Sequence, residues 1–304
     1  MIDHPETQEH AQRATRRRAA LPPLAAAAAL LLGAWLVPSP ASLAQPAARA
    51  AAMPVLRVCL YGGFAPFAID DGGVWKGWDV DYLRGFAAAN RLAFQVVKEK
   101  EFKNIWLRPG EDRCDVAGTS ISDTADRRKA TGSAGEWTAT YYGVVRAFLV
   151  RTADREKLQR VADLAGKTVI VTADSTADND LRNRVAQSHV GNVTIHGTDS
   201  EEAAADQVRK GAAFAYGGGY GSVVELAKRG GLVVVWPHCN MVTVTEHGST
   251  RFEEYAEPFS FVVRKESGRL AALDAYIRNP KNVYEGTAIP DLGCKPPPWV
   301  PTKP

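Results

Sequence analysis

The chain has 304 residues, of which 45% are hydrophobic and 23% are charged, and its formal net charge is +3 at pH 7. This length is sufficient for two domains, each with a core of its own. The charge is too small to indicate a nucleic-acid partner or binding to an anionic membrane surface, so we expect neither.

The N-terminus has the pattern of a secretory signal peptide. Basic residues 16–18 precede an Ala- and Leu-rich stretch, residues 21–37, which is too short and too rich in Ala for a good membrane span. Ser42-Leu43-Ala44 has the small residues of a cleavage site. We therefore predict a cleaved signal peptide at residues 1–44 and a disordered leader at residues 45–54. Sec export fits better than twin-arginine export, and an uncleaved anchor is the alternative.

The first strand after the leader is apolar and runs from Val55 to Leu60. A loop follows at its carboxyl end, residues 61–67, and ligands of open α/β sheets bind at that end of the strands. Phe64 lies in this loop between a glycine and an alanine, which makes it a candidate for ligand contact, with core packing as the alternative. We assign Phe67 to core packing.

A helix is predicted after a short hairpin. Residues 70–73, Asp-Asp-Gly-Gly, form the turn of the hairpin. The helix then starts near Asp79, which is the expected N-cap, and continues to about Asn90. We assign Asp79 and Asp81 to capping and structure, and not to a catalytic pair.

The segment that carries the functional prediction begins with a short apolar strand, residues 114–118. Three small hydroxyl residues follow it. Thr124 is then the expected N-cap of a helix whose first turn holds Arg127, where the helix dipole disfavours a cation. Hydroxyls, backbone N–H groups and a guanidinium together describe a cradle for a carboxylate. The alternative is a solvated, Arg-rich start of a helix. The three hydroxyl residues are Thr119, Ser120 and Ser122.

Export would place the four cysteines, Cys59, Cys114, Cys239 and Cys294, in an oxidising compartment. Four cysteines allow three pairings, and buried free thiols are the alternative to disulfides. Cys59 and Cys114 would lie on neighbouring strands but a few residues apart along them, so the pairing stays open. The sequence has no Cys-x-x-Cys motif and no His cluster, so we predict no metal and no cofactor.

The second half of the chain again alternates strands with helices. Ser175 or Thr176 is expected to cap the helix that follows the first of these strands. The free N–H groups at that helix start are suited to meet a carboxylate from the opposite side. The predicted strands are residues 167–171, 193–195, 212–216 and 232–236, and the predicted helices are residues 200–211 and 222–228.

Three of these segments resemble motifs of the family 3 extracellular solute-binding proteins, the polar amino-acid receptors of ABC importers. Residues 119–127 resemble the family's Ser-Gly-Met-Thr-Ile-Thr-Pro-Glu-Arg. Residues 77–82 resemble Gly-Phe-Asp-Val-Asp-Leu, and residues 257–265 resemble Glu-Pro-Phe-Gly-Ile-Ala-Val-Arg-Lys. The resemblance implies an α/β fold of periplasmic-binding-protein type II. In that fold two lobes each hold a mainly parallel sheet flanked by helices, with the ligand cleft between them.

The resemblance extends in order over residues 55–277 and implies a division of the chain. The first lobe would comprise residues 55–151, followed later by residues 255–304 with the return strand, the closing helix and a Pro-rich tail. The second lobe would comprise residues 152–254. The hinges would then lie near Arg151 and Tyr255.

The family's site residues transfer to matching positions here. Arg127 would clamp the ligand carboxylate with help from Ser122, and Phe64 and Phe102 would stack on the ligand. The candidate ligand-binding residues are Phe64, Phe102, Thr119, Ser120, Ser122, Arg127, Ser175, Thr176 and Gly218.

The sequence departs from the family where a ligand ammonium would bind. Gly218 stands in place of the ammonium-binding aspartate, and Tyr61 in place of another common acid. A buried ammonium without a carboxylate partner is unfavourable. Either another acid substitutes, or the ligand is not an ordinary α-amino acid. The glycines would admit a bulkier ligand or form a tight turn. The substitute acids that we consider are Asp174, Asp178 and Glu246.

Three functions follow, in order of preference. The first is a monomeric periplasmic receptor that closes on an amino acid or related small carboxylate and delivers it to an ABC permease. The second is a non-transport accessory protein of a quinoprotein dehydrogenase, because such proteins resemble this family and carry cysteines at the positions of Cys59 and Cys114. The third, an enzyme resembling cyclohexadienyl dehydratase, needs an acid at the second-lobe strand end, where this chain has glycines. We therefore predict a binding protein and no enzyme.

Overall fold

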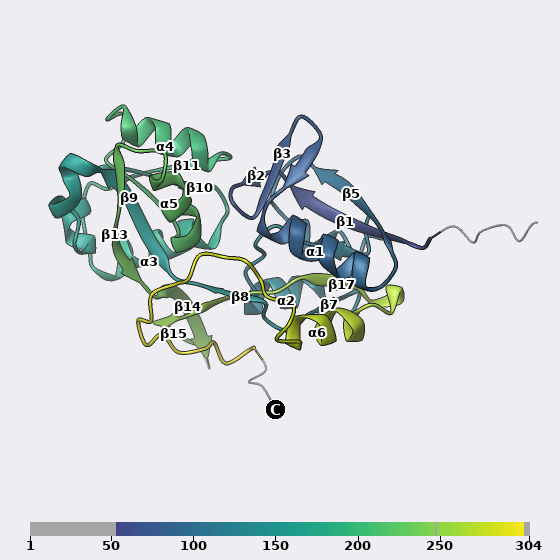
Figure 1. Ribbon diagram of the computed structural model, residues 1–304. Coiled ribbons are helices and arrows are strands. Elements are labelled where there is room, and N and C mark those ends of the chain that lie inside the picture. The colour runs from purple at the N-terminus through teal and green to yellow at the C-terminus, as the bar shows by residue number, and fades with distance from the viewer. Residues whose placement is uncertain (1–52, 247, 301–304) are drawn as a thin grey trace, which may run out of the picture. The chain divides into compact units, whose positions relative to one another are not determined.

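The computed structural model describes residues 53–246 and 248–300. The predicted signal peptide, residues 1–44, and most of the predicted leader lie outside these residues. In the described part, helices and strands form two lobes, each built on a five-stranded sheet (Figure 1). None of the described helices is long and apolar enough to cross a membrane.

The sheet of the first lobe takes strands from both ends of the described chain. Its elements and the helices packed on it are β1 (Val55–Tyr61), α1 (Trp78–Ala89), β5 (Ala93–Glu99), β6 (Val116–Ala117), β7 (Gly135–Trp137), β17 (Val262–Arg264) and α6 (Leu270–Arg278). The strand order is β5-β1-β6-β17-β7. β1 is parallel to β5 and β6, whereas β17 is antiparallel to β6 and β7. Val80, Leu83 and Phe86 of α1 and Leu273 of α6 are buried in the core of this lobe.

Two smaller features flank this sheet. A three-stranded sheet comprises β2 (Gly63–Phe64), β3 (Ala68–Asp71) and β4 (Val74–Lys76), and the turn between β3 and β4 confirms the predicted hairpin. Helix α2 (Ala125–Thr131) begins after Thr124, whose hydroxyl accepts a hydrogen bond from the Arg127 backbone N–H. The predicted N-cap of α2 is thereby confirmed.

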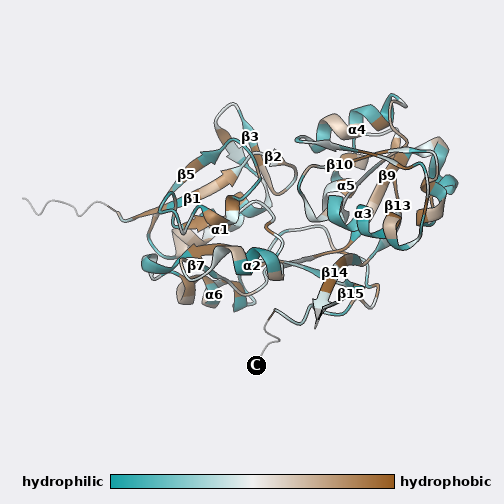
Figure 2. Ribbon diagram, turned by 180° about the vertical axis from the view of Figure 1, so that it is seen from behind, coloured by the Kyte–Doolittle hydropathy of each residue, from teal (hydrophilic) through white to brown (hydrophobic). Residues whose placement is uncertain are grey.

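The second lobe has its own sheet with helices on both faces. Its elements are β9 (Arg146–Arg151), β10 (Thr168–Thr172), α3 (Thr176–Gln187), β11 (Thr194–Thr198), α4 (Glu201–Arg209), β12 (Ala215–Gly219), α5 (Tyr220–Ala227) and β13 (Leu232–His238). The strand order is β11-β10-β12-β9-β13, with β9 antiparallel to both of its neighbours. α4 and α5 pack on one hydrophobic cluster of the sheet and α3 on the other. Figure 2 shows β9 and β13 as hydrophobic strands beside the largely hydrophilic α3.

The chain passes between the lobes on two paired strands. β8 (Tyr142–Val144) is antiparallel to β16 (Glu257–Phe259). β9 already belongs to the second sheet from Arg146, so the first crossing lies at Val145 and not near the predicted Arg151. The reason is that β9 is buried along nearly its whole length between β12 and β13. A hairpin of β14 (Asn240–Glu246) and β15 (Ser249–Tyr255) precedes the return crossing.

Two short segments form 3₁₀ turns and not α-helices. The turn at Ile105–Leu107 follows Asn104, whose backbone is left-handed (φ 62°). The second turn is Val161–Leu164. The other 3₁₀ segments of the described chain are Thr152–Lys157 and Lys265–Ser267.

All four cysteines form disulfides, which resolves the open pairing. Cys59 in β1 is bonded to Cys114, which precedes β6, and Cys239 is bonded to Cys294 in the tail. Both Cα–Cα distances are 5.7 Å, so neighbouring strands bring the first pair close enough despite their offset along the chain.

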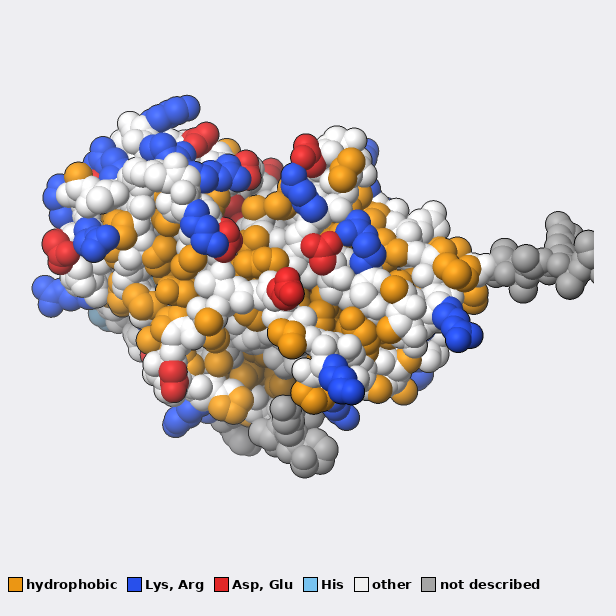
Figure 3. All heavy atoms as spheres, viewed as in Figure 1, with side chains coloured by type: hydrophobic (Ala, Val, Ile, Leu, Met, Phe, Trp, Pro, Cys, Tyr) orange, Lys and Arg blue, Asp and Glu red, His pale blue; other side chains and the backbone are white. Residues whose placement is uncertain are grey.

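The tail after α6 is extended and contacts both lobes. The Tyr284 hydroxyl donates to Asp79 at 2.6 Å, and the Trp299 indole donates to the Asp123 carbonyl at 2.8 Å; both acceptors lie in the first lobe. Thr287 donates to Glu225 of α5 in the second lobe at 3.2 Å. On the face shown in Figure 3, acidic and basic side chains mix over the first lobe, in agreement with the small net charge of the chain.

Candidate functional site

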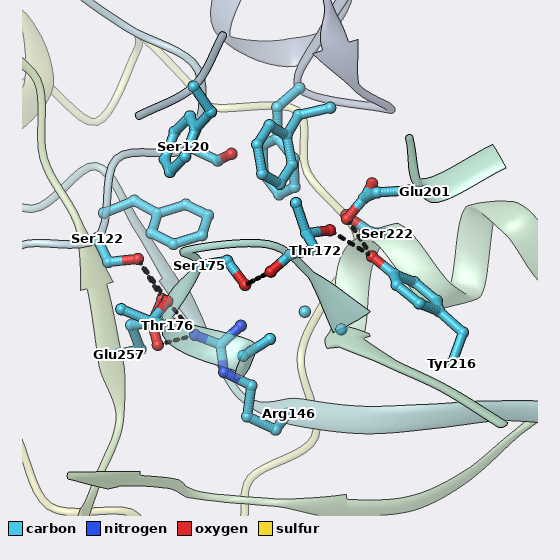
Figure 4. Close-up of a pocket in the computed structure, with 17 residues that line it drawn as sticks. Ser120, Ser122, Arg146, Thr172, Ser175, Thr176, Glu201, Tyr216, Ser222 and Glu257 are labelled. Atoms are coloured by element: carbon cyan, nitrogen blue, oxygen red, sulfur yellow. Dashed lines mark hydrogen bonds and ion pairs between the residues drawn. The ribbon is translucent and has the colours of Figure 1, made fainter. Parts of the chain in front are cut away.

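A small cavity lies where the two lobes meet, and residues of both contribute to its lining (Figure 4). Its volume is about 30 Å³. The first lobe contributes the loops after β1 and β6, and the second lobe contributes the ends of β10 and β12 and the start of α3. These are carboxyl ends of strands and a helix N-terminus, which is where α/β sheets bind ligands.

The structure brings seven of the nine predicted site residues to this cavity. Two do not line it, namely Thr119 and Arg127. Their neighbours in sequence do, so the predicted segment is at the cavity although two of its side chains point elsewhere. The seven are Phe64, Phe102, Ser120, Ser122, Ser175, Thr176 and Gly218.

The hydroxyl segment of the first lobe has an unusual backbone. Thr119 and Ser120 both have positive φ angles, 77° and 47°, which non-glycine residues seldom adopt. The Thr119 hydroxyl accepts from the Tyr61 N–H at 3.0 Å, and Asp79 accepts from the Ser120 N–H at 2.5 Å. The Thr119 side chain is therefore used to fix the loop and is fully buried outside the cavity.

Asp79 supports this loop and does not cap its own helix. The N-cap of α1 is Gly77, and the Asp79 carboxylate accepts hydrogen bonds from Tyr141 at 3.0 Å and Tyr284 at 2.6 Å as well as from Ser120. Burial raises the pKa of Asp79 to about 6, although these donors favour its charged form. The prediction of an N-cap was wrong because the carboxylate is turned toward the cavity loop.

Arg127 does not reach the cavity, contrary to its predicted role as the carboxylate clamp. Its guanidinium lies 4.2 Å from the ring centroid of Trp106 and 5.5 Å from that of Phe102, and it donates to the Ser122 carbonyl at 3.1 Å. Within residues 53–246 and 248–300, no carboxylate oxygen lies within 4.0 Å of it. Burial lowers the pKa of Arg127 to about 10. Cation–π contact with two rings replaces the anion that we expected it to bind.

A buried ion pair that the sequence analysis missed takes the place of a ligand carboxylate. Glu257, the first residue of β16, accepts hydrogen bonds from Ser122, from Thr176 at 2.8 Å and from the Arg146 guanidinium. Arg146 also donates to Thr176 at 2.6 Å and to Asn240 at 2.9 Å. Both charged residues are at most 5% exposed. The hydroxyls that were predicted to hold a ligand therefore hold the protein's own carboxylate (Figure 4).

The opposite side of the cavity has a second acid, Glu201, that the analysis also missed. It is the first residue of α4 and is 3% exposed. Oε1 accepts from the Tyr216 hydroxyl at 2.7 Å, Ser222 lies close enough to favour the charged carboxylate, and Oε2 has no well-formed hydrogen bond among the described residues. Burial raises the pKa of Glu201 to about 7. Nothing in the sequence indicated its burial, because Glu201 is one of two acids in the first turn of an amphipathic helix, where acids are usually exposed.

The acids that the sequence analysis considered lie elsewhere. Asp174 pairs with Lys103 of the first lobe at 3.2 Å, and Asp178 pairs with Arg182 at 2.7 Å. The side chain of Glu246 lies outside the described residues. Glu201 is thus the acid that faces the cavity beside the end of β12.

The glycines at the end of β12 make room for Tyr216 and not for a bulky ligand. A Cβ at Gly218 would lie 3.0–3.1 Å from the Tyr216 ring and hydroxyl, and one at Gly219 would lie 3.2 Å from a Val144 methyl. Tyr216 is fully buried and its hydroxyl lies 3.1 Å from that of Thr172. Gly218 therefore lets the ring lie close to the strand, where its hydroxyl reaches Glu201.

Aromatic rings close the first-lobe side. The Phe64 and Phe102 centroids are 4.7 Å apart in an edge-to-face arrangement, and Phe67 and Phe259 also line the cavity. The Tyr61 hydroxyl donates across to the Asp199 carbonyl of the second lobe at 2.6 Å. With the Ser122–Thr176 contact at 3.0 Å, this bond joins the lobes directly, so the structure is a closed form.

The chain resembles known proteins in sequence and in fold. The model of the bacterial extracellular solute-binding proteins, family 3, matches residues 56–282. No curated protein matches the sequence.

Solved structures with the same fold include three ligand-binding proteins. An ancestral arginine-binding protein bound to arginine is 20% identical, with a TM-score of 0.60, covering 73% of this chain and 90% of that one. The GluR0 ligand-binding core with L-glutamate is 19% identical, with a TM-score of 0.58 over 74% and 91% of the two chains. Holo ArgBP from T. maritima is 21% identical, with a TM-score of 0.58 over 75% and 92%. These similarities confirm the predicted type II fold.

Proposed function

The chain belongs to the bacterial extracellular solute-binding proteins of family 3, and we propose that it is the periplasmic substrate-binding protein of an ABC importer. Its two lobes would close on a small solute related to the amino acids and deliver it to a permease. The observation that carries this proposal is the cavity between the lobes, lined by hydroxyls, aromatic rings and the partly unsatisfied Glu201. Structures of similar fold hold arginine or glutamate, which supports this class of solute.

The residues have separate parts in this function. Phe64 and Phe102 give the solute an apolar surface, and Glu201 offers an acceptor to a donor group. Lobe contacts such as Tyr61 to Asp199 form when the lobes close. Opening around the β8–β16 crossing would expose the cavity and release the solute. This binding role needs no bond to be broken, so we propose no catalytic residue.

A thermal-shift screen of the exported protein tests the proposal. The panel comprises amino acids, small amines and small carboxylates. A solute at a hundred times its dissociation constant should add about 2.7 kcal/mol to the free energy of unfolding. A matched pair of variants, Phe102→Ala and the surface change Glu202→Gln, checks the location: only the first should lose the shift. A folded protein that no panel member stabilises would contradict the proposal.

A second candidate is a non-transport accessory protein of a quinoprotein dehydrogenase. The filled carboxylate cradle at Ser122, Thr176 and Arg146 favours it, because a site satisfied by Glu257 needs no ligand to remain folded. The Cys59–Cys114 disulfide is compatible with the same assignment. Tight association with a dehydrogenase and no solute binding would support this candidate against the receptor.

For the enzyme alternative, the presence of Glu201 is favourable and the size of the cavity is unfavourable. Glu201 supplies the acid near the end of β12 that the sequence analysis had not found, and its pKa of about 7 suits proton transfer. However, the cavity of this closed form, with a volume of about 30 Å³, is small for a cyclohexadienyl ring. We therefore propose a receptor.

A further inference from the structure

The cavity already contains a carboxylate. Three groups that suit a ligand's carboxylate, the hydroxyls of Ser122 and Thr176 and the guanidinium of Arg146, all donate to Glu257. Glu257 is 3% exposed and is held at the start of β16 by pairing with Val144. A ligand carboxylate would have to displace it and leave a buried charge unpaired, which typically costs about 3–5 kcal/mol.

The opposite wall lacks a donor. Oε2 of Glu201 is buried without a well-formed hydrogen bond among the described residues, although Ser222 lies close enough to favour the charged carboxylate. Buried acceptors normally have a partner. The charged side chains that line the cavity are Arg146, Glu201 and Glu257, so the lining holds two acids and one base. Arg127 lies behind the lining against the Trp106 and Phe102 rings, and the charge with which it interacts most strongly is that of Glu257.

The remaining surface suits a small cation. Phe64 and Phe102 line the cavity, and aromatic faces attract ammonium groups. The cavity is small in the closed form, with a volume of about 30 Å³. A small volume favours a small ammonium ion over a larger one.

We propose that this cleft binds a small organic ammonium ion that carries no carboxylate, with the ammonium donating to Glu201 and Glu257 acting as a built-in carboxylate. This inference rests on the proposed receptor function and narrows its solute class. It explains together the occupied cradle, the incompletely hydrogen-bonded Glu201 and the small cavity. Glu257 of the protein would then supply the carboxylate that an amino-acid ligand carries itself, and the solute would supply only the ammonium group.

Calorimetric titration at pH 8, where Glu201 is mostly ionised, tests the inference. Three probe series are used on the purified exported protein: methylamine, ethylamine and ethanolamine; glycine, alanine and serine; acetate, propionate and lactate. We expect at least one amine to bind, and more tightly than every amino acid and carboxylate. The isosteric variant Glu201→Gln should weaken amine binding at least about ten-fold, because a charge-assisted hydrogen bond is lost. Glu202→Gln is the matched control, since Glu202 pairs with Arg229 outside the site, and should bind within about two-fold of the parent.

The outcomes separate the inference from the receptor function. If an amino acid or a carboxylate binds more tightly than every amine, or if Glu201→Gln leaves amine affinity unchanged, the inference is overturned and the receptor stands. If no probe of any series binds to the folded protein, both fall. A second variant, Glu257→Gln, removes the built-in charge but keeps a similar shape. We expect it to gain affinity for acetate or glycine of at least about ten-fold through the freed Arg146, and no gain would count against the inference.

Discussion

The two sides of the cavity hold one buried glutamate each, and the two glutamates differ in how they are satisfied. Glu257 accepts from two hydroxyls and a guanidinium, whereas Glu201 accepts from Tyr216 through Oε1, has Ser222 nearby and makes no well-formed hydrogen bond through Oε2. Burial raises the pKa of Glu201 to about 7. The comparison shows that equal burial has opposite consequences: a paired carboxylate is part of the structure, and an unpaired one is available to a ligand.

Removal of the cation from the satisfied side should have the largest effect. Arg146→Ala leaves Glu257 buried without its ionic partner, so we expect the free energy of unfolding to fall by about 3–5 kcal/mol in urea denaturation. Arg182→Ala, which breaks the more exposed pair with Asp178, should lower it by less than about 1 kcal/mol. Equal losses in both variants would mean that the buried pair contributes no more than a surface pair does.

Glu201 should make the free energy of unfolding depend on pH. The folded-state pKa of Glu201, about 7, lies above its ordinary value of 4.5, so the folded protein binds the proton more tightly than the unfolded chain. Stability must then fall as pH rises from about 4.5 to about 7. We expect Glu201→Gln to be more stable than the parent at pH 8 by about 1–3 kcal/mol and nearly equal to it at pH 4.5.

The difference in the free energy of unfolding between Glu201→Gln and the parent, followed across pH, reports on Glu201 alone. Asp79, whose pKa is raised to about 6, acts in the same direction, but it is present in both and cancels from the difference. A difference that stays constant between pH 4.5 and pH 8 in urea titrations would show that Glu201 does not change its protonation there.

The smallest effect is expected at the glycine that makes room for Tyr216. In Gly218→Ala the new methyl lies 3.0–3.1 Å from the Tyr216 ring and hydroxyl, so the ring must shift and its hydrogen bond to Glu201 weakens. We expect a loss of about 1 kcal/mol in the free energy of unfolding. Gly191→Ala, where a Cβ meets nothing within 4 Å, is the control and should change little. If Gly218→Ala loses no more stability than Gly191→Ala, the Tyr216 ring moves aside without a measurable cost.

The sequence predicted where the site lies better than how its groups are paired. Ser122 and Thr176 were found from local signals, a strand end followed by hydroxyls and a helix cap, and both line the cavity. Their partner Glu257 is 135 residues from Ser122, and no local pattern shows which distant side chain will satisfy a given hydroxyl. The same limit explains why Arg127 was assigned to the cavity although Trp106 and Phe102 hold it aside.

The missed acid has a different cause. Glu201 begins a helix whose pattern is amphipathic, and acids at helix starts are common on the surface. Its Oε1 is held by Tyr216, whose ring lies close to the strand at Gly218, where a side chain would crowd it. The glycines were noticed as an absence of acid, whereas in three dimensions they make room for the group that holds the acid.

The order of the disulfides along the chain has a consequence for biogenesis. Each cysteine is bonded to the next one in sequence, Cys59 to Cys114 and Cys239 to Cys294. A chain that enters an oxidising compartment from its N-terminus presents these partners in succession. An oxidase that joins consecutive cysteines as they emerge would thus make both native bonds directly, and production of the protein should depend on an oxidase and not on an isomerase.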